Sequence, residues 1–118
     1  MNYVDGFLLP VAKKNVSAYR SMARKAGKIW REYGALEFRE CVGDDLGVKM
    51  GLSFSKRLKL KPTETVVFSW ISYRSRAHRD RVNAKVMKDK RFHDMHSDSL
   101  PFDGKRMIFG GFKVMVEA

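Results

Sequence analysis

Hydrophobic and polar residues follow two distinct periods along this chain. Between residues 13 and 33, apolar side chains recur every three or four positions with lysines and arginines between them, which predicts an amphipathic helix. Between residues 66 and 73, β-branched and aromatic residues occupy both alternating faces, which predicts a strand covered on both sides. The whole pattern predicts the order strand, helix, strand, strand, helix, strand, at residues 2–11, 13–33, 35–42, 66–73, 76–88 and 105–117.

Residues with special backbone preferences mark the ends of these elements. Asn15 and Ser75 are expected to cap the two helices at their starts, and Gly34 is expected to end the first helix. Pro10 has no backbone N–H and is expected to end the pairing of the first strand. Residues 48–64 are expected to contain a short, exposed, extended segment.

This order of elements predicts an α+β fold with the ferredoxin-like βαββαβ arrangement, in which two helices cover one face of a four-stranded antiparallel sheet. A chain of 118 residues has the size of one domain, so we expect a single domain over residues 1–118. Three strands are apolar on both faces, yet the helices can cover only one. An apolar patch of that size is unusual on a monomer, so we expect a homodimer with sheet facing sheet, a dimeric α+β barrel.

The chain is strongly basic, with 24 lysines and arginines against 13 acidic residues and a net charge of +11. Seven basic residues lie within 13–31 and eight within 74–91, so the charge is concentrated on the predicted helices. Such faces are either solvated or bind an anionic partner such as nucleic acid. No ribonucleoprotein-type motif accompanies the charge, so nucleic acid is the less favoured partner.

Several classes of protein are not expected. No signal peptide and no apolar run of about 20 residues is visible, so we expect a cytoplasmic protein without a membrane partner. The lone Cys41 predicts no internal disulfide. His93 and His96 share a helical spacing, but two ligands do not make a site, so no metal is expected. No phosphate-binding loop or nucleophile elbow is present, and no cofactor is expected.

Two carboxylates fall in unusual surroundings. Asp5 and Glu40 each lie among apolar neighbours in a predicted strand. A carboxylate in such a place is either paired with a cation or has a raised pKa. Gly110 and Gly111 interrupt the last strand, which costs stability unless something approaches closely there, such as a bulge, another backbone or a ligand.

Short motifs spread along the chain carry a resemblance to a known family. They are Tyr3-Val4-Asp5-Gly6-Phe7, Gly34-Ala35-Leu36, Gly43-Asp44-Asp45, Val66-Val67-Phe68-Ser69-Trp70 and Pro101-Phe102-Asp103-Gly104-Lys105-Arg106-Met107. With these motifs the chain resembles the YbaA-like family, small bacterial proteins of unknown function. The resemblance implies the dimeric α+β barrel superfamily, and it implies no established activity.

The superfamily includes cofactor-independent monooxygenases, isomerases and dehydratases, which hold small molecules between sheet and helices or at the barrel wall. The resemblance therefore implies a protein that binds or transforms a small aromatic or carbonyl compound, in which a carboxylate near an arginine abstracts a proton. The catalytic candidates are Glu40, Tyr73, Arg79 and Asp80, and the ligand-binding candidates are Asp5, Trp70, Asn83, Asp103 and Arg106. One alternative is that these groups only form salt bridges and caps. The other is a non-enzymatic binding module for an anionic partner, through the basic helices.

Overall fold

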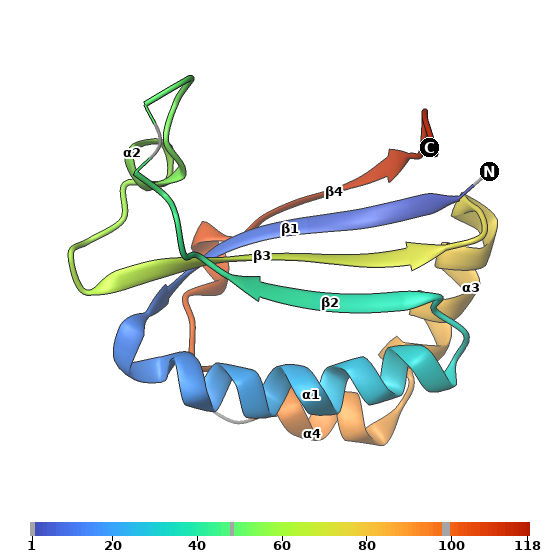
Figure 1. Cartoon of the computed structure of the whole chain (residues 1–118). Coiled ribbons are helices and arrows are strands. Elements are labelled where there is room, and N and C mark those ends of the chain that lie inside the picture. The colour runs from blue at the N-terminus through green and yellow to red at the C-terminus, as the bar shows by residue number, and fades with distance from the viewer. Residues whose placement is uncertain (1, 48, 98–99) are drawn as a thin grey trace.

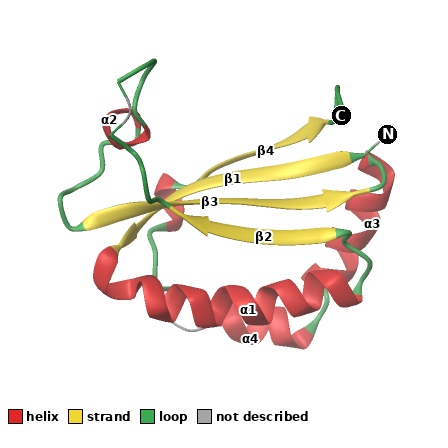
Figure 2. Cartoon of the chain, in the orientation of Figure 1, coloured by secondary structure: helices red, strands yellow, loops and turns green. Residues whose placement is uncertain are grey.

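The four strands form one antiparallel sheet in the order β2-β3-β1-β4 (Figure 1). The structure, a computed structural model, describes residues 2–47, 49–97 and 100–118. The strands are β1 (Tyr3–Ala12), β2 (Glu37–Val42), β3 (Glu64–Tyr73) and β4 (Ile108–Lys113). One face of the sheet is covered by α1 (Val16–Glu32), α3 (Arg76–Met87) and α4 (Lys90–Ser97), as Figure 2 shows. The predicted ferredoxin-like arrangement is therefore confirmed.

The central strand β1 pairs with β3 on one side and with β4 on the other. Its pairing with β3 runs from Tyr3 to Ala12, whereas its pairing with β4 ends at Leu8. Pro10 therefore does not end the strand, because it lies beyond β4 and pairs with Val66 of β3 only. The expectation for Pro10 is therefore wrong for the pairing with β3. A proline is tolerated at this position because the other edge of the strand has no neighbour there.

The ends of the helices show which capping predictions are right. Gly34 has a φ of +111° and ends α1, with hydrogen bonds from the N–H of Gly34 to the carbonyl of Arg31 and from the N–H of Ala35 to that of Trp30. The hydroxyl of Ser75 accepts a hydrogen bond of 3.0 Å from the backbone N–H of His78, which confirms it as the cap of α3.

The side chain of Asn15 makes no capping bond, although Asn15 directly precedes α1. Residues 13–15 form a 3₁₀ turn, η1 (Lys13–Asn15), so the backbone of Asn15 is not extended as a capping residue requires. The predicted extended segment within 48–64 is also wrong, because that region contains the one-turn helix α2 (Phe54–Arg57). Figure 1 shows α2 near one end of the sheet, on the side away from α1 and α4. The last strand is shorter than predicted and follows a second 3₁₀ turn, η2 (Gly104–Arg106).

The core lies between the sheet and the helices and has two parts. One is built around Ile29, Ile71 and Tyr73, and the other around Leu9 and Tyr19. Phe7 packs against both. Among the described residues, none of the helices combines the length and apolar character needed to cross a bilayer. The two apolar clusters leave a space between them, which contains the candidate site.

Candidate functional site

A cavity of about 360 Å³ lies between the sheet and the helices, and we call it the sheet–helix cavity. Its walls are mainly apolar and aromatic, and they include Phe7, Leu9, Met22, Ala26, Trp30, Phe38, Ile71, Met87, Phe92, Met95, Phe102, Met107 and Phe109. Its charged side chains are those of Asp5, Glu40 and Arg79. An apolar cavity with a few converging polar groups is the usual form of a small-molecule site.

Asp5 and Arg79 form an ion pair at one end of this cavity. Nη1 of Arg79 lies 2.6 Å from Oδ1 of Asp5, and the Asp5 side chain is only 8% exposed. The Nε of Arg79 donates to Oδ1 of Asp80 at 2.8 Å, and the guanidinium stands 5.0 Å from the centre of the Tyr3 ring. Arg79 is thus fixed by two carboxylates and by a cation–π contact.

Asn83 extends this polar cluster towards α1 and β3. Its Oδ1 accepts hydrogen bonds from Nε1 of Trp30 at 3.1 Å and from the hydroxyl of Tyr73 at 3.2 Å. The side chain of Asn83 also lowers the pKa of Asp5. Because β3 leads through the Ser75 cap directly into α3, Tyr73, Arg79 and Asn83 are brought together by a short stretch of chain. The cluster therefore joins three elements to β1.

The surroundings of the cluster change the pKa values of Asp5 and Tyr73. Burial raises the pKa of Asp5, and the charge of Arg79 and its hydrogen bond oppose that shift only in part. Burial and the nearby charge of Asp5 raise the pKa of Tyr73, so the phenol keeps its proton and acts as a donor. Burial therefore favours the protonated form of both groups.

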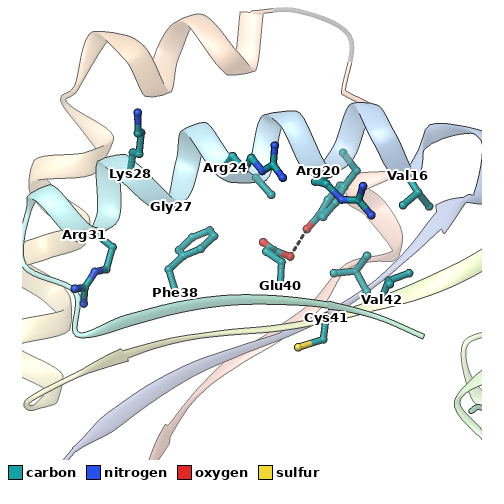
Figure 3. Close-up of a pocket in the computed structure, with 13 residues that line it drawn as sticks. Val16, Arg20, Arg24, Gly27, Lys28, Arg31, Phe38, Glu40, Cys41 and Val42 are labelled. Atoms are coloured by element: carbon teal, nitrogen blue, oxygen red, sulfur yellow. Dashed lines mark hydrogen bonds between the residues drawn. The ribbon is translucent and has the colours of Figure 1, made fainter. Parts of the chain in front are cut away.

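Glu40 and Tyr19 form the second polar pair of the cavity. The Tyr19 hydroxyl on α1 donates a hydrogen bond of 2.8 Å to Oε2 of Glu40, drawn as a dashed line in Figure 3. As a whole residue Glu40 is exposed, because β2 is an edge strand, but its carboxylate lies among protein atoms beneath α1. This local burial raises the pKa of Glu40, and the hydrogen bond from Tyr19 lowers it by a smaller amount.

The two polar pairs stand at separate ends of the cavity. Phe7 of β1 is opposite Ser69 of β3, and Ser69 is opposite Glu40 of β2. Glu40 is therefore level with Phe7 but two strands away, and Asp5 lies two residues from Phe7 along β1. With ordinary strand spacings, the Cα atoms of Asp5 and Glu40 are roughly 12 Å apart. A ligand between them would have apolar walls along its length and a polar group at each end.

The other candidates lie outside this arrangement. Trp70 stands on the open face of the sheet beside Phe68, away from the helices. Asp103 is exposed and accepts a hydrogen bond from the N–H of Lys105, which caps η2. Arg106 pairs with Glu64 at 2.7 Å and binds backbone carbonyls near α2. Asp80 is exposed and reaches the site only through Arg79.

Three residues of the site were not among the sequence candidates. Tyr3 carries the cation–π contact, Trp30 binds Asn83, and Tyr19 binds Glu40. Each lies in an apolar pattern that predicts a core position, and that pattern does not reveal the polar or cation–π contact that the ring makes in the site. Within the described part of the chain, no three His, Cys, Asp or Glu residues come close enough to hold a metal ion, and the side chain of His96 lies outside that part.

A second hollow, the α1–β2 groove, runs along the edge of the sheet and has a volume of about 560 Å³ (Figure 3). Phe38 and Glu40 point from β2 towards α1, whereas Cys41 points away from it. Basic residues of α1 line the other side of this groove: Arg20, Arg24, Lys28 and Arg31.

Comparisons with known proteins place the chain in a family. A family described as "Protein of unknown function (DUF1428)" matches residues 2–104. The chain belongs to the DUF1428 family. It is 44% identical over 117 residues to "Uncharacterized protein YbaA" of Escherichia coli K12, and equally to that of Shigella flexneri, with 99% of each chain covered. The resemblance to the YbaA-like family is therefore confirmed, and these relatives have no assigned activity.

Solved structures show the same fold at low sequence identity. Rv0793 from Mycobacterium tuberculosis has a TM-score of 0.61 and 13% identity, with 100% of this chain and 99% of that chain covered. A putative antibiotic biosynthesis monooxygenase from Nitrosomonas europaea has a TM-score of 0.61 and 11% identity, with 97% and 90% covered. A dimeric ferredoxin-like protein from an uncultured marine organism has a TM-score of 0.56 and 13% identity, with both chains covered completely. At these identities the likeness shows the fold of the DUF1428 chain and not its reaction.

Proposed function

We propose that this DUF1428 protein binds a small, flat aromatic or carbonyl compound in the sheet–helix cavity. The observation that carries the proposal is the form of the cavity: apolar and aromatic along its length, with one polar pair at each end. Apolar walls supply most of the binding free energy of a small ligand, while a few polar groups fix its orientation. Asp5, Arg79 and Asn83 would hold one end of the compound.

At the other end, Glu40 is the group best suited to accept a proton. A raised pKa brings a carboxylate closer to neutral pH, where general bases are most effective. The proton would pass from a hydroxyl or an acidic C–H of the compound to the carboxylate of Glu40, leaving a phenolate or an enolate. Tyr19 would hold the carboxylate in place. The transfer needs no further reactant.

We also propose that the protein is a homodimer whose sheets face each other. The open face of the sheet carries Phe68, Ile108 and Phe112, which are 46%, 55% and 61% exposed. A patch of this kind favours a self-complementary contact, and one structural neighbour is described as dimeric. Light scattering at micromolar concentration should give twice the 13.6 kDa mass of the chain, and Phe68→Glu should give a folded monomer. A monomeric wild-type protein would refute this proposal.

A nucleic-acid-binding module is the weaker alternative. Binding to single strands combines a basic groove with exposed aromatic rings on which bases stack. Here Phe68 and Phe112 are exposed on the open face, while the basic residues of α1 lie along the α1–β2 groove at the opposite face. The two features therefore do not form one surface.

The binding proposal can be tested through the two tryptophans of the chain. In a Trp70→Phe protein, the remaining tryptophan is Trp30, which lines the cavity. The fluorescence of Trp30 should change as 2-naphthol is added and reach a plateau when the cavity is fully occupied. Ala26→Phe, which fills the cavity, should weaken this binding by at least about tenfold. Ala18→Phe is the matched control, since Ala18 is exposed on the same helix. Equal binding by both variants, or none in the parent protein, would contradict the proposal.

A further inference from the structure

The α1–β2 groove and the sheet–helix cavity meet at one place. Tyr19, Phe38 and Glu40 line both of them. The groove is open along the edge of the sheet, while the cavity extends beneath the sheet towards Asp5. A molecule seated at this junction would therefore have part of its surface in the groove and part in the cavity.

The groove differs from the cavity in its charge. Four basic residues line the groove, Arg20, Arg24, Lys28 and Arg31, against the single carboxylate of Glu40. In the cavity, the carboxylates of Asp5 and Glu40 outnumber the one guanidinium on the same face of the sheet, that of Arg79. The excess positive charge is thus confined to the groove, at the outer end of the cavity.

Two of these arginines, Arg20 and Arg24, pair with no carboxylate among the described residues. Arg31 donates hydrogen bonds to the carbonyls of Ala35 and Leu36, which fixes it at the end of α1. Arg20 and Arg24 are four residues apart on α1, so their side chains leave the same face of the helix with a rise of about 6 Å between them.

This arrangement suits an anion with an apolar body. An arginine binds a carboxylate through two parallel hydrogen bonds, and a one-signed groove raises the local concentration of oppositely charged ligands. The apolar lining of the groove, with Val16, Ala23 and Val42, continues through Phe38 into the cavity. A carboxylate placed at the arginines would therefore leave the apolar remainder of the compound in contact with apolar walls.

We propose that the ligand of this protein is an aromatic carboxylate, with its acid group bound by Arg20 and Arg24 in the groove and its ring system extending past Glu40 into the sheet–helix cavity. This inference rests on the proposed function, whose cavity it uses, and it names the chemical class of the compound. The hydroxyl or acidic C–H that Glu40 deprotonates would then lie next to the carboxylate on the ring system.

The test compares two probes of the same shape and different charge. In the Trp70→Phe protein, 2-naphthoate should bind at least about tenfold more tightly than the neutral 2-naphthamide at low salt, as measured by calorimetry. The advantage should shrink as salt is added, because Arg20 and Arg24 are exposed. Arg20→Gln with Arg24→Gln should remove the advantage and leave the binding of 2-naphthamide unchanged.

A matched control removes the same charge elsewhere. Lys14→Gln with Lys25→Gln changes two exposed residues that line neither the groove nor the cavity, and it should keep the preference for 2-naphthoate. Equal affinity of the two probes for the parent protein would overturn the inference and leave the proposed function standing. An equal loss of preference in both double variants would also overturn it. Absence of binding by either probe and by 2-naphthol would overturn both proposals.

Discussion

The hydroxyl of Tyr19 on α1 donates a hydrogen bond of 2.8 Å to Oε2 of Glu40 on β2, at the junction of the α1–β2 groove and the sheet–helix cavity. The bond holds the carboxylate of an edge strand beneath a helix, where protein atoms replace part of its water. The bond thus positions Glu40 towards the cavity, where burial favours its protonated form and the bond itself opposes part of that shift.

The first prediction concerns the stability of the protein as a function of pH. Because burial raises the pKa of Glu40 above 4.5, the folded state holds this proton more tightly than the unfolded state, and stability is lost as pH rises through the folded pKa. Glu40→Gln can still accept the bond from Tyr19 but carries no charge. Urea unfolding from about pH 4 to about pH 8 should therefore show the wild type losing free energy of unfolding relative to this variant.

Tyr19→Phe provides the matching control for this experiment. The hydrogen bond from Tyr19 lowers the pKa of Glu40, so its removal should make the pH-dependent loss larger and extend it to higher pH. A difference between the wild type and Glu40→Gln that does not change with pH would show that Glu40 titrates normally.

The second prediction concerns proton transfer. If Glu40 accepts a proton in the cavity, the protein should accelerate exchange of the acidic C–H protons of 2-tetralone in D₂O, which proton NMR measures directly. Glu40→Gln should reduce this acceleration by about 100-fold, in the range usual for loss of a general base. Ala18→Phe should not affect it. Exchange that continues unchanged in Glu40→Gln would exclude Glu40 as the base.

The third prediction concerns the ion pair between Asp5 and Arg79. Arg79→Met leaves the carboxylate of Asp5 buried without a cation and should lower the free energy of unfolding by about 3 kcal/mol. Asp80→Ala should cost less than about 1 kcal/mol, because that carboxylate is 62% exposed. Adding Asp5→Asn to Arg79→Met should restore part of the lost free energy of unfolding. If the double variant instead loses the sum of what the two single variants lose, this account is contradicted.

The fourth prediction concerns the two glycines of β4. A Cβ on Gly111 would meet the hydroxyl of Tyr3 and its Cζ atom at 2.8 Å, so Gly111→Ala should push away the ring that supports Arg79. The expected cost is about 2 kcal/mol. At Gly110 the nearest atoms are 3.8 Å away in Phe112, and Gly110→Ala should be close to neutral. Equal unfolding midpoints for the two variants would refute the packing argument.

Candidate residues that are close in the chain are also close together in the structure. β3 ends at Tyr73 and the capped helix α3 begins three residues later, so this short stretch of chain alone places Tyr73, Arg79 and Asn83 near one another. Asp5 and Glu40 are visible because a charged residue interrupts an apolar strand. Gly111 is visible because only a close approach justifies a glycine in a strand, and Tyr3 supplies that approach; the structure shows no such approach at Gly110.

Other parts of the site depend on contacts that no local pattern contains. β3 is apolar on both faces, so the pattern does not say which face the helices cover, and Trp70 belongs to the other one. Asp103 and Arg106 lie in a turn whose position depends on Glu64 and on the loop after α2. Tyr19 lies on an apolar stripe, and its partner is 21 residues away.

The most direct test of the central claim is to locate a bound ligand by its contacts with methionine methyl groups. Met22, Met87, Met95 and Met107 line the sheet–helix cavity, while Met50 and Met115 are largely exposed elsewhere. With ¹³C-methyl methionine and saturating 2-naphthol, we predict nuclear Overhauser effects from the ligand to the cavity methionines and none to Met50 or Met115. Binding that produces no effect at any of the four cavity methyl groups would contradict the account.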